Sequence, residues 1–174
     1  MNTAIQIYKA TEKDVAIVRE IAIQTFLETF REYNTEENMK AYLANTFSTE
    51  KIKLELNDPH TSIYLALHLD DVVGYLKLKK SDPPKELESH KVLEIERIYV
   101  LKDFHGKRVG LLLLERAIAI AKEHHLDYLW LGVWEHNPRA IRFYEKNGFN
   151  SFGNHVFVLG DDKQNDLLMK RALY

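Results

Sequence analysis

The stretch Glu94–Leu114, EIERIYVLKDFHGKRVGLLLL, decides how this 174-residue chain is interpreted. Its first residues alternate in character, which is typical of a strand. The alternation places four residues on one face of that strand: Glu94, Glu96, Ile98 and Val100. A loop at residues 102–110 follows, with two glycines and two adjacent basic residues. An apolar helix at residues 109–124 begins where this loop ends, so we expect strand, loop and helix in direct succession.

A helix that begins directly after glycines and basic residues is a candidate anion site. The first backbone N–H groups of a helix have no partner within it, the helix dipole is positive at that end, and glycine lets a phosphate approach closely. The spacing is not that of a P-loop, and residues 106–110, GKRVG, lack the third glycine of the dinucleotide-binding fingerprint. The alternative is an ordinary tight turn between strand and helix with basic residues at its surface. The residues alone leave both interpretations open.

Two segments resemble motifs of the GNAT-family N-acetyltransferases. HGKRVG at residues 105–110 resembles the acetyl-CoA pyrophosphate loop of that family, Q/R-x-x-G-x-G/A. NPRAIRFYEKNGF at residues 137–149 resembles the more specific pattern N-x-x-A-x-x-F-Y-x-x-x-G-F. The segments EIERIYV, WLGVWE, FYEKNGF and GDDKQNDLLM are most similar to PaiA-type spermine/spermidine acetyltransferases. His105 and Arg108 depart from the family's loop pattern, and Arg108 would need a backbone angle that glycine reaches more easily.

The resemblance implies acetyl-CoA as the cofactor and CoA as the product. It places the cofactor in a cleft where the central strand and the strand at residues 128–134 diverge, with the pyrophosphate on the loop and pantetheine along the strand end. The side chain of Arg108 would compensate for its departure by pairing with a phosphate. The expected cofactor contacts are Ile98, Tyr99, Val100, His105, Gly106, Lys107, Arg108, Val109, Gly110, Leu111, Asn137, Ala140 and Tyr144.

Acetyl transfer to an amine requires a neutral amine, a donor for the oxyanion and a proton for the leaving thiolate. The resemblance implies Glu96 as the general base and Tyr144 as the general acid. Glu94 is the alternative base or a second carboxylate for a cationic amine, and a water relay would serve either glutamate. In the non-catalytic interpretation Glu96 pairs with an arginine such as Arg97 or Arg116, and Tyr144 is a packed helix aromatic.

The acceptor is expected on the first two helices and the last hairpin, where the family places it. These helices carry Glu28, Glu32, Glu36 and Glu37. Such acids suit a polycation, although a solvated helix face gives the same pattern. The expected substrate contacts are Glu28, Glu94, Glu96 and Trp134; both Trp130 and Trp134 are otherwise interpreted as core or pocket lining.

The predicted function is therefore N-acetylation of a primary amine, with a polyamine (spermidine or spermine) as the acceptor. One alternative is another amine: a peptide or protein N-terminus, a lysine or an aminoglycoside. The other alternative is a CoA-binding regulatory protein without catalysis, against which the presence of both Glu96 and Tyr144 argues.

Composition sets further bounds. A net charge of −2 disfavours non-specific binding to nucleic acid or acidic membranes. The absence of cysteine excludes disulfides and thiolate catalysis and fits a cytoplasmic location. No signal peptide and no apolar run near the ~18 residues of a membrane span are recognised.

The eight histidines lack metal-ligand spacing, and residues 160–166 predict a hairpin turn rather than a calcium loop. A homodimer is one expectation for the oligomeric state.

The periodicities predict one α/β (α+β) domain over residues 1–174 with the element order βααα-βββ-αβαββ. A mixed, mostly antiparallel twisted sheet of about seven strands should carry helices on both faces, in agreement with the GNAT fold, and the central strand–helix–strand unit should be a right-handed crossover. The predicted N-caps are Thr11, Thr35, Thr49 and Asn137. The predicted strands are 4–8, 62–69, 72–78, 92–100, 128–134, 149–159 and 166–172; the predicted helices run from Thr11 to about Phe30 and over 36–45, 50–56, 109–124 and 138–147.

Overall fold

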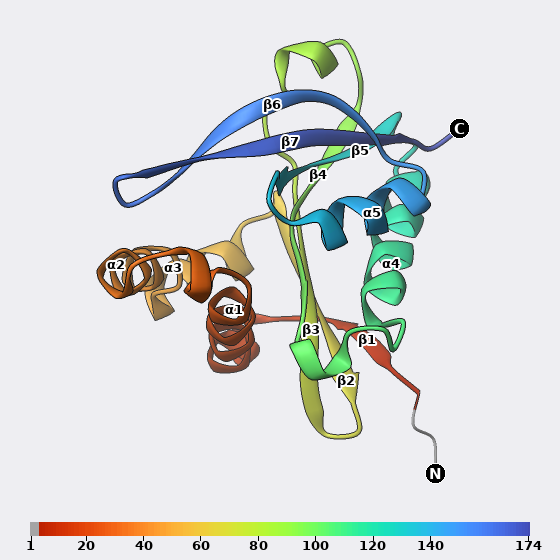
Figure 1. Ribbon diagram of the computed structural model, residues 1–174. Helices are drawn as coiled ribbons and strands as arrows, with labels where there is room; N and C mark the ends of the chain where they lie inside the picture. The colour runs from red at the N-terminus through yellow and green to blue at the C-terminus, as the bar shows by residue number, and fades with distance from the viewer. Residues whose placement is uncertain (1–3) are drawn as a thin grey trace.

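The computed structural model describes residues 4–174, so the first three residues of the predicted domain lie outside the described part. The five α-helices of the described residues are α1 Val15–Phe30, α2 Glu36–Thr46, α3 Thr49–Asn57, α4 Val109–Glu123 and α5 Pro138–Lys146. The strands are β1 Gln6–Lys9, β2 Thr61–His68, β3 Asp71–Lys79, β4 Val92–Val100, β5 Tyr128–Trp134, β6 Asn150–Leu159 and β7 Asp162–Ala172 (Figure 1). Within residues 4–174, no helix is long and apolar enough to cross a membrane.

The strands form one mixed sheet in the order β1-β2-β3-β4-β5-β7-β6. Every neighbouring pair is antiparallel except β4 and β5, which are parallel and joined through α4. The prediction of a mostly antiparallel sheet with one strand–helix–strand crossover is therefore confirmed. The single parallel pair lies in the middle of the sheet, where both faces are covered.

Helices cover both faces of the sheet, as predicted: α1, α2 and α3 lie on one side, and α4 and α5 on the other (Figure 1). On the α4 side, Leu113, Leu114 and Ala117 are completely buried against the strands. On the α1 side, Phe26 and Tyr75 belong to a second buried cluster. Full burial of one such large side chain contributes roughly 1.5–3 kcal/mol, so two apolar layers hold the sheet between them.

Side-chain caps start three of the helices. Thr35 and Asn137 each accept a hydrogen bond from the backbone N–H three residues on, at 3.2 Å, which confirms both predicted N-caps. The predicted cap Thr49 is wrong, because the Ser48 hydroxyl makes this contact instead, also at 3.2 Å, and Thr49 is the first residue of α3. Adjacent Ser and Thr offer the same hydroxyl acceptor, so the pattern alone could not separate them.

Two other elements begin elsewhere than predicted. The first helix does not start as an α-helix after Thr11: a 3-10 turn, Glu12–Asp14, comes first and α1 follows it. Strand β7 begins at Asp162 rather than Asp166, because the hairpin turn consists of residues 160 and 161 alone. The polar residues near the tip of this hairpin are paired because the backbone hydrogen bonds between β6 and β7 continue as far as the turn. Their polar composition is typical of a turn and so did not indicate a strand.

Strand β4 contains a bulge at Glu96. On β3, Lys77 pairs with Arg97 and Leu78 pairs with Ile95, so Glu96 has no partner residue across the ladder. The extra residue moves the alternation by one position after Glu96. Glu94 and Glu96 share a face as predicted, but the prediction that Ile98 and Val100 lie on that face with them is wrong. On the α4 side lie Ile95, Ile98 and Val100, whereas the α1 side carries Glu94, Glu96, Arg97 and Tyr99.

Strands β4 and β5 separate just before the bulge. They pair only where Val92–Glu94 lies beside Tyr128–Trp130. Beyond this point β5 stays paired with β7 as far as Trp134, while β4 stays paired with β3 as far as Val100. The sheet therefore opens between its two central strands, at the place where the sequence predicted a cleft.

Candidate active site

A pocket of about 1060 Å³ fills the opening between β4 and β5. Its wall combines residues of α5 and the start of α4 with residues of α1, β6 and β7. The pocket therefore extends from one face of the sheet to the other. The part beside α4 and α5 is called the α4–α5 half below, and the part beside α1 is called the α1 half.

The start of α4 lines the α4–α5 half. The loop before it is left-handed at two residues, with φ 77° at Gly106 and φ 65° at Arg108, which confirms the backbone angle expected for Arg108. Val109, Gly110 and Leu111 line the pocket, and N–H groups in this first turn have no acceptor within the helix. Together with the positive end of the helix dipole, these groups can bind a phosphate.

His105 ties the end of β4 to α5. Its Nε2 lies 2.8 Å from the carbonyl oxygen of Val100, and its Nδ1 contacts the guanidinium of Arg139. Burial lowers the pKa of His105 and Arg139 adds to this effect, although the bond to Val100 opposes it. A neutral imidazole that donates from Nε2 and accepts at Nδ1 satisfies both contacts. Both ring nitrogens of His105, an expected cofactor contact, are therefore engaged within the protein, and Arg139 contributes a cation to the pocket wall.

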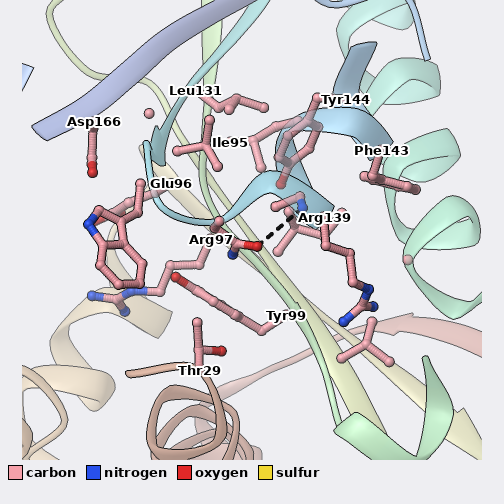
Figure 2. A pocket seen from close by; sticks show the side chains of 18 of the residues that line it. Thr29, Ile95, Glu96, Arg97, Tyr99, Leu131, Arg139, Phe143, Tyr144 and Asp166 are labelled. Atoms are coloured by element: carbon pink, nitrogen blue, oxygen red, sulfur yellow. Dashed lines mark hydrogen bonds between the residues drawn. The ribbon is translucent and has the colours of Figure 1, made fainter. Parts of the chain in front are cut away.

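Tyr144 directs its hydroxyl into the pocket from α5 (Figure 2). Its ring packs against Phe143 and Phe149, with ring centres 5.3 and 5.4 Å away. Within residues 4–174 its hydroxyl makes no hydrogen bond, and burial, with a contribution from Tyr99, raises the pKa of Tyr144 well above its ordinary value. The phenol therefore stays protonated at neutral pH and can donate a proton inside the pocket.

Glu96 is held by a buried cation. The ammonium of Lys77, whose side chain is 3% exposed, lies 2.9 Å from Glu96 and 2.8 Å from Glu55 of α3. The partner is thus Lys77 rather than Arg97 or Arg116, the arginines considered from the sequence. Burial by itself would raise the pKa of Glu96, but Lys77 and then Arg97 outweigh it and hold this pKa below its ordinary value. Glu96 is therefore ionised at neutral pH.

Glu94 has the opposite electrostatic character. Its carboxylate accepts a hydrogen bond of 2.6 Å from the Ser81 hydroxyl. Burial raises the pKa of Glu94, a shift that Ser81 opposes and the charge of Glu96 reinforces. Two carboxylates two residues apart thus differ in proton affinity, because one has a buried cation beside it and the other does not.

Asp166 is another carboxylate in the pocket wall, and it was not predicted from the sequence. It lies on β7 directly opposite Trp134 of β5 and His155 of β6. A Cβ atom added to Gly132 would lie 3.3 Å from its Oδ2, so the carboxylate lies over a position without a side chain. Burial raises the pKa of Asp166 to about 6, an effect that His155 opposes and Glu135 reinforces.

Aromatic rings surround Trp134 in the α1 half. The ring centres of Phe30, Tyr33 and His136 lie 5.7, 4.9 and 5.4 Å from that of Trp134. All four residues line the pocket. The α1 half thus combines aromatic faces with carboxylates, a combination that suits a cationic ligand with an apolar body.

Nearly all of the predicted site residues line this one pocket. They are Ile98, Tyr99, Val100, His105, Gly106, Arg108, Val109, Gly110, Leu111, Asn137, Ala140, Tyr144, Glu28, Glu94, Glu96 and Trp134. Lys107 is not part of the wall, and its ammonium lies 4.8 Å from the ring centre of Phe104. The exposed Glu32, Glu36 and Glu37 are also outside the wall.

Three residues of the pocket wall were not predicted from the sequence: Arg139, His155 and Asp166. Arg139 lies inside the second motif at one of its variable positions, so only its spacing from Asn137 could have indicated it. The signal available for Asp166 was an acidic residue at the start of the predicted last strand. An acidic residue at that place also fits a turn. The described residues contain no group of three or more histidine, aspartate or glutamate side chains suited to a metal ion.

Comparisons with known proteins agree with this geometry. Residues 18–149 match the sequence profile of the Acetyltransferase (GNAT) family. A protein described as an uncharacterized N-acetyltransferase in the pepI 3′ region of Lactobacillus delbrueckii subsp. lactis is 40% identical over 98% of this chain and 99% of its own length. A spermidine N(1)-acetyltransferase of Thermoplasma acidophilum is 25% identical over 84% of this chain and 88% of its own length.

A solved structure shares the fold of this chain. The crystal structure of the PaiA N-acetyltransferase of Thermoplasma acidophilum in complex with coenzyme A superposes with a TM-score of 0.80 at 22% identity, covering 97% of this chain and 99% of that one. At that identity the likeness shows the fold. The profile match, in contrast, spans most of the chain and contains both the loop before α4 and the segment around Tyr144. The protein therefore belongs to the acetyltransferase (GNAT) family and is an N-acetyltransferase.

Proposed function

We propose that this N-acetyltransferase transfers the acetyl group of acetyl-CoA to a primary amine, and that the amine is a polyamine such as spermidine or spermine. The observation that carries the proposal is the hydroxyl of Tyr144. It is protonated, makes no hydrogen bond within residues 4–174 and faces a pocket whose other half contains carboxylates. A proton donor opposite anionic groups matches the needs of acetyl transfer to a cationic amine.

The α4–α5 half suits the coenzyme. The N–H groups of Val109, Gly110 and Leu111 and the side chain of Arg108 would hold its pyrophosphate. Gly110 faces the ring of Phe143, at 3.7 Å from where its Cβ atom would lie, so the start of α4 and α5 adjoin at this end of the pocket. The backbone of residues 98–100 and the Asn137 side chain would hold the pantetheine arm. The bound coenzyme supplies an activated thioester.

Tyr144 would protonate the sulfur as the carbon–sulfur bond breaks. A phenol whose pKa is raised by burial is neutral in the resting site. The sulfur gains negative charge as the carbon–sulfur bond breaks, and the neutral phenol beside it can donate its proton at that moment. The role proposed for the Tyr144 hydroxyl is therefore proton donation. The contacts of the Tyr144 ring with Phe143 and Phe149 fix the direction in which this hydroxyl points.

Glu96 has two candidate roles, which are to take the amine proton or to attract the cationic amine. Its ion pair with Lys77 supports attraction, because a carboxylate of lowered pKa is ionised but accepts protons weakly. Loss of the base in Glu96→Gln should lower activity steeply near pH 7, with partial recovery as the pH approaches the pKa of the amine. Loss of attraction alone should raise KM and leave the pH profile unchanged, which is the result we expect.

The acceptor is proposed from the chemistry of the α1 half. Carboxylates line it from several elements: Glu28, Asp82, Glu94, Glu96 and Asp166. Separated anionic groups with aromatic surfaces between them suit an extended polycation better than a monoamine. The spermidine acetyltransferase among the relatives supports the same acceptor class.

A turnover screen tests this proposal. Acetyl-CoA should be consumed with spermidine or spermine at a higher kcat/KM than with short peptides, lysine or aminoglycosides. Preference for one of those other amines would replace the polyamine and keep the acetyltransferase. Coenzyme binding with no turnover on any amine would instead support the regulatory alternative.

A further inference from the structure

Asp166 lies on the opposite side of the pocket from the other site carboxylates. Its strand β7 lies beyond β5, whereas Glu94 and Glu96 come from β4, on the other side of the opening. Figure 2 shows Asp166 and Tyr144 entering the pocket from opposite sides. Asp166 therefore borders the pocket from the side of β5 and β7, where an acceptor amine in the α1 half can contact it.

Asp166 also lacks the internal partner that the neighbouring carboxylates have. Glu96 is paired with Lys77, Glu94 accepts from Ser81, and Glu28 accepts from the backbone N–H of Lys102 at 2.8 Å. Within residues 4–174, the carboxylate of Asp166 makes neither a hydrogen bond nor an ion pair. A half-buried carboxylate without a partner is costly to keep ionised. It becomes useful where a ligand supplies the missing proton or cation.

We propose that Asp166 accepts a proton from the acceptor ammonium and so produces the neutral amine that attacks; this rests on the proposed function. As the N–H bond breaks, its proton forms an O–H bond on Asp166, and the nitrogen lone pair forms the C–N bond. The C–S bond then breaks, and the sulfur takes a proton from Tyr144. The nitrogen loses a second proton, which restores Tyr144, and Asp166 gives its own proton to solvent. One ammonium and one thioester thus yield one amide, one thiol and one proton.

The electrostatic surroundings of Asp166 agree with this role. Burial raises its pKa to about 6, His155 on β6 opposes the shift, and Glu135 after β5 reinforces it. Burial is the main cause that raises the pKa of Tyr99 on β4, and the charge of Asp166 adds to this shift. Tyr99 therefore stays neutral. At pH values well above about 6 Asp166 is mostly ionised and can accept a proton, and at pH values well below about 6 it is mostly protonated. Glu96, with its lowered pKa, is ionised throughout that range and would give no such limit.

The test is the pH profile of kcat/KM from pH 5 to 9.5 with spermidine, for the wild type, Asp166→Asn and the control Asp162→Asn. Asp162 is exposed on the same strand and accepts a hydrogen bond from Gln164, which an asparagine oxygen can still accept. The wild type and the control should lose activity below about pH 6. Asp166→Asn should be roughly 10²–10⁴-fold slower at pH 7, the usual contribution of a general base. Its rate should rise with pH as solvent supplies neutral amine.

A second variant separates proton transfer from binding. In Asp166→Ala, added formate should restore part of the rate, because a small carboxylate can occupy the vacated position. An unchanged acid limb in Asp166→Asn, or a higher KM with the same profile, would overturn the proposal and leave Asp166 a binding or structural residue. If neither variant folds, carbon NMR can follow the titration of the Asp166 carboxyl group in the wild type. A titration midpoint near pH 4 would overturn the proposal. A wild type that acetylates no amine would instead refute the proposed function.

Discussion

Replacement of Lys77 by methionine tests the buried ion-pair network beside the active site. Lys77 lies between Glu55 and Glu96, at 2.8 and 2.9 Å, and its side chain is 3% exposed. Methionine keeps most of the apolar stem and removes the ammonium. Both carboxylates would then remain partly buried without the cation that compensates them.

The expected loss follows from the geometry. Removing one partner of a fully buried ion pair costs about 3–5 kcal/mol. Here the side chains of Glu55 and Glu96 are 17% and 26% exposed, so water recovers part of this loss and we expect about 2–4 kcal/mol. In a chain of 174 residues, a loss of that size lowers Tm by roughly 4–16 °C.

The pH dependence gives the sharper result. The lowered pKa of Glu96 means that its ionised form stabilises the wild type above its ordinary titration range, and that this contribution is lost as the pH falls through the lower folded pKa. In Lys77→Met the largest charge that opposes burial is gone, so the pKa of Glu96 rises from its wild-type value, with Arg97 and Lys79 still opposing the shift. The difference in stability between wild type and variant should therefore be largest near pH 7 and shrink toward pH 4, where neutral carboxyl groups need no cation.

Urea denaturation at several pH values measures this difference. The matched control is Lys79→Met on the same strand, since Lys79 is only partly buried and has no ion pair within residues 4–174. We expect that change to stay within about 0.5 kcal/mol, as is usual at surface positions. Equal losses in the two variants, or a loss for Lys77→Met that does not vary with pH, would refute the account of the network.

Two further substitutions test the α4–α5 half. Tyr144→Phe should keep coenzyme affinity in calorimetry but lower kcat by about one to three orders of magnitude, the size of a lost general acid; wild-type turnover would make Tyr144 a packing residue. Arg108→Gly should be more stable than Arg108→Ala by about 1 kcal/mol in urea denaturation, because only glycine relieves the positive φ. Both Arg108 variants should bind CoA equally weakly, and equal stability would mean that this residue is not strained.

The fold was largely predictable because its signals are local. The almost continuously apolar run of residues 128–134 predicted β5 with the bounds that the structure has, Tyr128–Trp134, and the Asn137-Pro138 start of α5 was also predicted correctly. A cap and a proline act within one helical turn, so their effect can be recognised without knowing the rest of the chain.

The bulge at Glu96 was not predictable from alternation. Its position depends on how β3 and β4 pair, and that pairing is a property of two distant segments. Lys77 was missed as the partner of Glu96 for the same reason. Asp166 enters the site through the register between β5 and β7, which no spacing along the chain reveals.

The most direct test of the central claim is a paired measurement of free thiol and acetylated spermidine during turnover of acetyl-CoA by the wild-type protein. Thiol release follows from a dye assay, and the acetylated amine is counted by mass spectrometry. The account predicts that thiol release depends on spermidine and that the two products form in equal amounts. Thiol release that does not require the amine, or no release at saturating acetyl-CoA and spermidine, would contradict it.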